Sequence, residues 1–302
     1  MKNIKLYNQD CLEGMQILAD ESIDVICIDP PYLYLKNQKL ERPFDEHKFF
    51  SECKRLLTKK GFIVMFGRGT SFYRWNTILA DLGFTFKEEI IWDKKQVSSP
   101  MNSISRRHET ISIFSKDKAV INKVKVPFIE ANRFEPHKID HAIYRITTTF
   151  GNRKTFQLLK EYYENGKYEY NEGKERKFNA TLQTDIKKTN RTLQFAITIE
   201  EGVMERSIIP QVRDHYSAIH PTQKPVRLLE RLLALVIPQD KEPKDTVVAD
   251  FFGGSFSTME AVHNMGLQGI SYEIDKEYFE AGKQRIEKLP PRQETLFDQL
   301  PP

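Results

Sequence analysis

The stretch TVVADFFGGSFSTMEA, residues 246–261, joins a buried strand, a glycine turn and the start of a helix. Its β-branched and apolar residues predict a strand over 246–252, and the spacing after the turn predicts a helix over about 257–265. Gly253 and Gly254 lie between these two elements. Glycines at such a turn let the backbone approach a ligand closely, and the helix N-terminus that follows favours negative groups. The stretch therefore predicts a ligand site at the end of a strand.

The next predicted strand, GISYEI (269–274), contains an acidic residue whose spacing from Asp250 indicates a function. Glu273 lies 23 residues past Asp250. In doubly wound folds an acid about 20 residues beyond the first glycine turn hydrogen-bonds a ribose diol. We therefore expect a nucleoside-containing cofactor. NAD fits less well, because the G-x-G-x-x-G spacing is absent.

Strands and helices alternate on both sides of a central segment, which predicts an α/β layered fold with a mixed, mostly parallel sheet. The first region, 1–116, and the third, 214–289, have this alternation. The predicted strands are 24–28, 62–66, 86–92, 109–115, 246–252 and 269–274. The predicted helices are 44–57, 71–82, 226–237, 257–265 and 276–288.

The central segment, 117–213, has a different composition and no such alternation. It contains 18 Lys and Arg against 13 Asp and Glu, whereas the whole chain has a net charge of +4. The positive excess of the protein therefore lies in this segment, which predicts an insert that binds a polyanion. The stretch 164–177 has the composition of a loop. The proline-rich residues 290–302 predict an extended tail.

The remaining composition excludes several classes of protein. The 302-residue chain is 39% hydrophobic and 29% charged, and no apolar run approaches the roughly 18–20 residues of a membrane span. The N-terminus lacks the apolar region of a signal peptide. The three cysteines form no C-x-x-C pair, and His215 and His220 lack partners at metal-ligand spacing. We expect a cytoplasmic protein without a metal.

The stretch VICIDPPYLYL, residues 25–35, ends a buried strand in Asp29-Pro30-Pro31-Tyr32. The two prolines fix their own φ angles, so the acid and the aromatic ring keep their relative placement. HPTQKP occupies 220–225, just before the second alternating region. Asp10 follows an Asn-Gln pair near the N-terminus.

Together these stretches resemble the amino-methylating DNA methyltransferases of the β arrangement. Residues 29–32 match their catalytic D-P-P-Y motif, and 250–255 are similar to their cofactor motif. HPTQKP resembles their H-x-T-Q-K-P signature, and Asp10 matches the acid near the adenine of the cofactor. The motifs occur in the β order, and the resemblance covers about residues 3–116 and 206–288. Four motifs in the correct order are far more specific than any one of them.

The resemblance implies a Rossmann-like fold, dependent on S-adenosylmethionine, with an inserted target-recognition region. It implies a site-specific DNA methyltransferase that acts on the N6 amine of a flipped-out adenine. The catalytic residues would be Asp29, Pro30, Pro31 and Tyr32. The cofactor-binding residues would be Asp10, Thr222, Gln223, Lys224, Asp250, Phe252, Gly253, Gly254, Ser255 and Glu273. It also implies a bacterial or phage origin, restriction–modification as the setting, and a homodimer.

The chemistry of the D-P-P-Y stretch agrees with this implication. The exocyclic amine of adenine is a poor nucleophile because its lone pair is delocalised into the ring. The Asp29 carboxylate and the Pro30 carbonyl can accept its two N–H groups and direct the lone pair toward an activated methyl group. In well-oriented systems such positioning supplies roughly 7–11 kcal/mol. Tyr32 would stack on the base, and a duplex base must first be flipped out to reach it.

The alternatives to adenine N6 methylation are cytosine C5 methylation, cytosine N4 methylation and DNA binding without catalysis. Cytosine C5 methylation needs a nucleophilic Cys, usually after Pro, and no cysteine here follows a proline. Cytosine N4 methylation stays open, although that subgroup more often has Ser in place of Asp29. Phe251 stands where many relatives have Pro, and Phe256 stands where the turn usually has its second glycine. Phe256 either narrows the pocket or points into the core, so a catalytically silent DNA-binding relative is the main competing hypothesis.

Two further sets of residues are candidates for partner contacts. Double-stranded DNA would meet basic residues near the catalytic half and in the insert: Arg106, Arg107, Arg145, Arg153, Lys154, Lys187, Lys188 and Arg191. In the tail, Gln293, Leu296 and Phe297 resemble the Q-x-x-L-F peptide that docks on bacterial sliding clamps.

Overall fold

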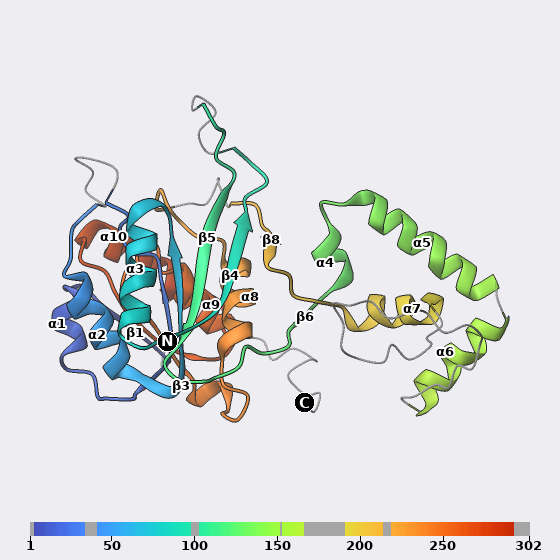
Figure 1. The fold of residues 1–302 in the computed structure, drawn as a ribbon, viewed down its shortest axis with the longest axis horizontal. Helices are drawn as coiled ribbons and strands as arrows, with labels where there is room; N and C mark the ends of the chain where they lie inside the picture. Colours follow the sequence, from blue (N-terminus) through green and yellow to red (C-terminus); the bar gives the residue numbers. More distant parts are fainter. Residues whose placement is uncertain are drawn as a thin grey trace. The chain divides into compact units, whose positions relative to one another are not determined.

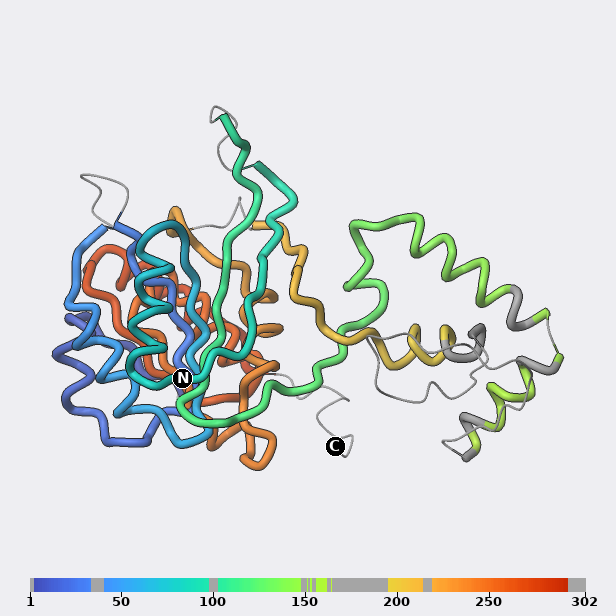
Figure 2. The backbone as a smooth tube through the Cα atoms, in the orientation of Figure 1, coloured from blue at the N-terminus to red at the C-terminus, as the bar shows by residue number. Residues whose placement is uncertain are grey.

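The computed structural model describes residues 3–33, 41–97, 103–151, 153–165, 191–213 and 219–292. The chain forms two compact units (Figures 1 and 2). The first combines residues 1–123 with 206–302, and the second consists of residues 124–205. Two segments that are distant in the sequence therefore build one unit, and the segment between them builds the other.

Eight strands among the described residues form the sheet of the first unit, in the order β1-β10-β9-β2-β3-β5-β4-β8. In this order the first five strands, from β1 through β10, β9 and β2 to β3, pair in parallel with their neighbours. β5 is antiparallel to both β3 and β4, and β8 is parallel to β4. The bounds are β1 Ile4–Tyr7, β2 Ile23–Ile28, β3 Leu57–Gly67, β4 Thr85–Asp93, β5 His108–Ser115, β8 Ile208–Pro210, β9 Val247–Asp250 and β10 Gln268–Tyr272.

Helices cover both faces of this sheet (Figure 1). Ile26 and Ile28 of β2 belong to an apolar cluster with residues of the first three helices. Because successive strand residues face opposite sides, Val25 and Cys27 face the other layer, where α8 contacts β2 and α9 contacts β9. The helices are α1 Cys11–Met15, α2 Glu46–Leu56, α3 Gly69–Asp81, α8 Val226–Val236, α9 Ser257–Asn264 and α10 Lys276–Glu287, with a short 3₁₀ helix, η1, at Pro243–Asp245.

The strand directions bring six chain segments to one edge of the sheet. The carboxyl ends of β1, β10, β9, β2 and β3 lie there because these strands are parallel. β5 runs in the opposite direction, with Thr110 opposite Gly67, so its beginning reaches the same edge. Ligands of open α/β sheets bind outside the carboxyl ends of the parallel strands. This edge is therefore the place where a functional site is expected.

The second unit is a small helical body. Phe128 of α4 and Phe195 of α7 pack edge to face with ring centroids 5.6 Å apart, and Ala142 of α5 and Leu158 of α6 are also buried. The elements are α4 Phe128–Asn132, α5 Pro136–Gly151, α6 Arg153–Asn165, α7 Arg191–Glu201 and the short pair β6 Lys125–Val126 and β7 Val203–Met204. Most of the loop predicted at 164–177 lies outside the described residues.

The strands and helices predicted in the first and third regions all occur, with bounds that shift by a few residues. The limits of the insert differ from the predicted 117–213. Residues 206–213 belong to the first unit, because Ile208 pairs with Ile91 and so adds β8 to the large sheet. β1, α1 and β8 were not predicted, since three to five residues carry too little periodicity.

No helix among the described residues has the length and apolar character of a membrane span.

Asp24, at the start of β2, links the two halves of the sheet unit. Its buried Oδ2 accepts the Val247 backbone N–H at 2.8 Å and Lys241 Nζ at 2.6 Å. Replacing Asp24 with Ala leaves that N–H without its acceptor, a loss of about 1–3 kcal/mol. We therefore expect urea denaturation of Asp24→Ala to show a lower free energy of unfolding. The control Asp240→Ala removes an exposed pair with Lys60 and should leave the midpoint unchanged. Equal midpoints for the two variants would contradict the role of Asp24.

Candidate active site

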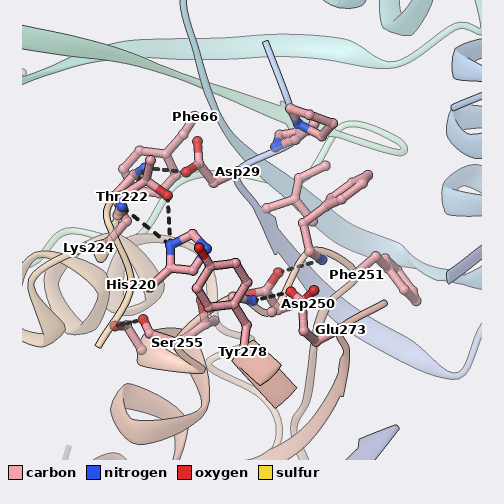
Figure 3. A pocket seen from close by; sticks show the side chains of 18 of the residues that line it. Asp29, Phe66, His220, Thr222, Lys224, Asp250, Phe251, Ser255, Glu273 and Tyr278 are labelled. Carbon is pink, nitrogen blue, oxygen red and sulfur yellow. Dashed lines mark hydrogen bonds and ion pairs between the residues drawn. The ribbon is translucent and has the colours of Figure 1, made fainter. Parts of the chain in front are cut away.

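A cavity of about 500 Å³ lies at the carboxyl edge of the sheet. Its lining comes from the ends of β1, β2, β3, β9 and β10, from the beginning of β5 and from residues 220–224. Figure 3 shows Asp29 and Lys224 on one side of it and Asp250 and Glu273 on the other, with His220 and Tyr278 between them. The two predicted sites therefore share one cavity.

The turn after β9 has the geometry that its glycines allow. The Gly253 N–H donates to the Tyr272 carbonyl at 2.7 Å, and a Cβ on Gly253 would lie 2.3 Å from a ring carbon of Phe256. Gly254 has a φ of +53°, which glycine adopts at no steric cost. Its N–H donates to Glu273 Oε2 at 2.7 Å. The turn therefore holds bare backbone beside a carboxylate that lines the cavity.

Two buried carboxyl groups lie around this turn. Asp250 accepts the Phe252 N–H at 3.1 Å, and burial raises its pKa to about 7, against the lowering effect of the Thr258 hydroxyl and of that N–H. Burial also raises the pKa of Glu273, although the Asp275 and Gly254 N–H groups oppose the shift. Buried acceptors of this kind suit the hydroxyl and amine donors of a nucleoside cofactor. The residues present therefore fit such a group.

Phe256 points into the core and does not line the cavity. Its ring is fully buried, packs edge to face on Phe279 at 5.9 Å, and lies where a Cβ on Gly282 would meet it at 2.6 Å. Its backbone φ is +56°, in the left-handed region that glycine adopts at no steric cost. The strain costs on the order of 1 kcal/mol, and burial of the ring offsets it. The turn keeps its shape without the second glycine.

Asp29 follows β2 and has both carboxylate oxygens engaged. Its Oδ1 accepts the Tyr32 hydroxyl at 2.6 Å, and its Oδ2 accepts the ammonium of Lys224. Pro30 and Pro31 also line the cavity, and Tyr32 packs on Trp75 with ring centroids 6.3 Å apart. The acid and the aromatic ring thus lie side by side, as the rigid Pro-Pro pair predicted.

Lys224, predicted as a cofactor contact, lies beside Asp29 in the same cavity. Its ammonium lies between Asp29 and Glu109, 3.4 Å from Glu109 Oε2, and 5.0 Å from the centroid of the Phe66 ring. The two carboxylates raise the pKa of Lys224 despite its burial. These two neighbours, acting against burial, therefore keep a cation at the candidate catalytic acid.

The other residues of the HPTQKP stretch organise its turn. The Thr222 N–H donates to His220 Nδ1 at 3.3 Å, and Gln223 Oε1 accepts the Ile219 N–H at 3.1 Å. Because Nδ1 is an acceptor, the neutral imidazole carries its proton on Nε2. Burial lowers the pKa of His220 to about 4, and its ring lies edge-on to Tyr278 at 4.3 Å.

A cluster of charges that the sequence analysis did not identify lies beside Asp29. Glu109, at the beginning of β5, accepts Lys94 Nζ at 2.5 Å and an Arg213 nitrogen at 3.3 Å, both on Oε1. Burial would raise the pKa of Glu109, but Lys224 and Lys94 lower it to about 2. A charged residue opening an otherwise apolar strand, ETISIFS, was the available signal. Lys94 and Arg213 follow β4 and β8 in plain sequence contexts, with no such signal.

The remaining predicted cofactor residues line the same cavity. Asp10 caps α1 by accepting the Leu12 N–H at 2.8 Å. Phe252 packs on Phe44 with centroids 5.2 Å apart, and Ser255 Oγ lies 3.0 Å from Ser257 Oγ. All three belong to the lining, as do Asp250, Gly253, Gly254 and Glu273. Within the described ranges no group of three His, Cys, Asp or Glu side chains is arranged for a metal ion.

The predicted DNA-contacting residues do not form one set. Arg106 lines the cavity, whereas Arg107 forms two hydrogen bonds with Asp93 at 2.8 and 2.9 Å. In the second unit Arg145 lies 5.3 Å from the Phe195 ring, and Arg153 is exposed. Lys154 and Arg191 belong to α6 and α7. Lys187, Lys188 and the tail residues Gln293, Leu296 and Phe297 lie outside the described residues.

A mostly parallel sheet, with a glycine turn and paired acids at its carboxyl edge, defines an α/β protein that binds a nucleoside cofactor. Comparison with protein families is more specific: residues 23–284 match the DNA methylase family. The chain belongs to this family of N6/N4 DNA methyltransferases.

Individual relatives agree with the family. The chain is 25% identical to the type II methyltransferase M.HinfI of Haemophilus influenzae over 309 residues, 93% of this chain and 68% of that protein. Two solved structures share the fold. The M1.HpyAVI–SAM complex has a TM-score of 0.52 at 20% identity, covering 93% of this chain and 99% of that one. The cytosine-N4-specific PvuII DNA methyltransferase has a TM-score of 0.58 at 16% identity, covering 97% and 88%.

The raised pKa of Asp250 predicts a pH-dependent stability. The carboxyl has a pKa of 3.8 when unfolded and about 7 when folded, so the folded state holds the proton more tightly. Stability from this group is therefore lost as the pH rises from about 4 to 7. Asp250→Asn should be more stable than the wild type by roughly 2–4 kcal/mol at pH 8, and by only about 1 kcal/mol at pH 4.5. Urea denaturation at both values measures this, and equal differences would contradict it.

Because Phe256 packs in the core, its replacement is predicted to lower the stability of the fold and to leave cofactor binding nearly unchanged. Phe256→Gly relieves the left-handed backbone but removes a fully buried ring, so the free energy of unfolding should fall by about 2–4 kcal/mol. The Kd for S-adenosylmethionine, measured by titration calorimetry, should change less than about threefold. Unchanged stability with a much weaker cofactor affinity would show that Phe256 shapes the pocket instead.

Proposed function

We propose that this DNA methyltransferase transfers a methyl group from S-adenosylmethionine to the N6 amine of adenine in double-stranded DNA. The observation that carries the proposal is the Asp29 carboxylate at the end of β2, in the same cavity as the glycine turn of β9. An acceptor for an amine and a site for a nucleoside cofactor are thus adjacent.

The cofactor site would consist of the turn and its acids. Glu273 would accept the ribose hydroxyls, and the backbone of Gly253 and Gly254 would lie against the cofactor. Asp10 and Asp250 would accept other donors of the same molecule. When bound, S-adenosylmethionine supplies a methyl group already activated by its sulfonium. The chain therefore needs no nucleophile of its own. The M1.HpyAVI–SAM structure, which shares the fold, supports this choice of cofactor.

The chain's contribution to the reaction is the placement of the amine. Asp29 and the Pro30 carbonyl would accept the two N–H groups and thereby orient the nitrogen lone pair. Tyr32 would stack on the base, a contact typically worth about 1–3 kcal/mol. The Tyr32 hydroxyl already donates to Asp29, which orients the carboxylate and the ring together. A duplex base would reach them only after flipping out of the stack.

Recognition of the DNA sequence is assigned to the second unit, residues 124–205. Its segment has a surplus of basic residues, which attract phosphates and position the protein, while base contacts specify the sequence. Arg106 lines the cavity, where the flipped base would enter. The other basic residues proposed for DNA contact, the homodimer, the sliding-clamp peptide, the restriction partner and the cytoplasmic location all stay predictions.

Cytosine N4 methylation is the second candidate. It uses the same amine chemistry, and the fold neighbour PvuII methyltransferase is cytosine-N4-specific. Adenine is favoured because Asp29 stands where the N4 subgroup more often has Ser. A catalytically silent relative is less well supported, because Phe256 packs in the core and leaves the turn open.

Methyl transfer from labelled S-adenosylmethionine to unmethylated DNA tests the proposal, with nucleoside analysis of the product. We expect N6-methyladenine from the wild type. Asp29→Ala removes the amine acceptor and should lower the rate at least about 100-fold. The matched control Asp81→Ala changes an exposed acid at the end of α3 and should keep full activity. N4-methylcytosine as the product would correct the target base, and an active Asp29→Ala variant would overturn the mechanism.

A further inference from the structure

We propose that Glu109 is a positioning residue for methyl transfer: it accepts the ammonium of Lys224 when the substrate amine occupies Asp29. The inference rests on the proposed function and adds to it a residue outside the family motifs. It concerns a buried carboxylate that lines the cavity but touches neither the glycine turn nor its acids.

The first step is that Asp29 is fully occupied in the structure. Its Oδ1 accepts the Tyr32 hydroxyl and its Oδ2 accepts the Lys224 ammonium. An amine from a base has to compete with a buried, charge-assisted hydrogen bond, which is about twice as strong as a neutral one. Efficient use of Asp29 therefore requires another acceptor for Lys224.

Glu109 provides that acceptor with the correct oxygen. Lys94 and Arg213 both contact its Oε1. Its Oε2 is buried, has no hydrogen-bond partner, and lies 3.4 Å from Lys224 Nζ. The two cations thus hold the carboxylate so that its open oxygen faces the lysine. A buried acceptor without a partner is costly, which makes a transient partner the natural explanation.

The movement required of Lys224 is small. Its ammonium already contacts both carboxylates and lies 5.0 Å from the Phe66 centroid. A shift from Asp29 to Glu109 keeps the ammonium paired with an anion throughout. The methyl transfer itself places positive charge on the amine beside Asp29, and a lysine drawn toward Glu109 opposes that charge less.

Removal of the Glu109 charge should therefore trap Lys224 on Asp29. Lys94, Arg213 and Lys224 would then lose the carboxylate that they share, and Asp29 would be the anion left to Lys224. The amine would bind in a poor orientation, and small misplacements reduce rates by up to roughly 100-fold. The cofactor acids Asp250 and Glu273 make no contact with the cluster, so cofactor affinity should persist.

A purely structural role for Glu109 makes a different prediction. If Glu109 only neutralises buried cations, then removing Lys224 relieves the surplus charge, and the melting temperature and the transfer rate of the Glu109 variant should recover together. If Lys224 blocks Asp29 once Glu109 is lost, then removing Lys224 should restore the transfer rate without a matching change in melting temperature. Measuring rate and melting temperature on the same variants therefore separates the two roles.

The experiment compares Glu109→Gln, Lys224→Met and the double variant with the wild type, and uses Glu89→Gln, an exposed Glu on β4, as the matched control. Single-turnover methyl transfer to unmethylated DNA and calorimetric binding of S-adenosylmethionine are measured on the full chain. We expect Glu109→Gln to lower the transfer rate on the order of 10–100-fold with cofactor Kd within about twofold. The double variant should be at least about fivefold faster than Glu109→Gln.

Thermal unfolding followed by circular dichroism shows whether Glu109→Gln folds. If it does not, Glu109→Asp serves in its place, because it keeps the negative charge. It withdraws the carboxylate by one methylene, so the rate should fall while the melting temperature stays near that of the wild type. Wild-type rates in Glu109→Gln or Glu109→Asp, or a double variant no faster than Glu109→Gln, would overturn the role of Glu109 and leave the proposed function standing. A wild type that binds cofactor but methylates no DNA would overturn both.

Discussion

The parallel pairing of β2 with β9 is the interaction on which the rest of the structure depends. Val25 lies opposite Val248 and Ile26 opposite Ala249, although more than 200 residues separate them in the chain. The Asp24 side chain supports the same junction by accepting the Val247 N–H. Because a shift of one residue would exchange the two faces of a strand, buried layers on both sides fix the register. The pairing brings Asp29 and Asp250 to one cavity.

The site contains buried carboxyl groups, and their burial has a free-energy cost that the surrounding core has to offset. Asp250 is buried with a pKa of about 7, whereas Glu109 is equally buried with a pKa of about 2. The difference follows from their neighbours: hydrogen-bond donors without charge surround Asp250, and three cations surround Glu109. The first environment suits neutral donors of a cofactor, and the second preserves an anion beside Lys224, the partner of Asp29.

Much of this arrangement is predictable from the sequence, because the strands that carry it are long and apolar. Local sequence patterns identify the glycine turn, Glu273 and the D-P-P-Y stretch. Each follows or ends a strand, and parallel strands bring their carboxyl ends to the same edge of the sheet. The Lys94–Glu109–Arg213 cluster is different: its members follow or begin β4, β5 and β8, and only antiparallel insertion of β5 brings them beside Asp29. The contact of Lys224 with Asp29 was not predictable either, since no local pattern shows which carboxylate a long side chain reaches. Phe256 was recognisable as a departure from the glycine of the motif, but the direction of its ring was not.

The central claim is that one cavity holds the cofactor at the β9 turn and the target base at Asp29. A crystal structure with a non-reactive analogue of S-adenosylmethionine and an unmethylated duplex containing the recognition sequence would test it most directly. We expect the ribose on Glu273, and an extruded adenine with its amine on Asp29 and its ring against Tyr32. A base that stays stacked in a bound duplex, or an analogue that binds away from the glycine turn, would contradict it.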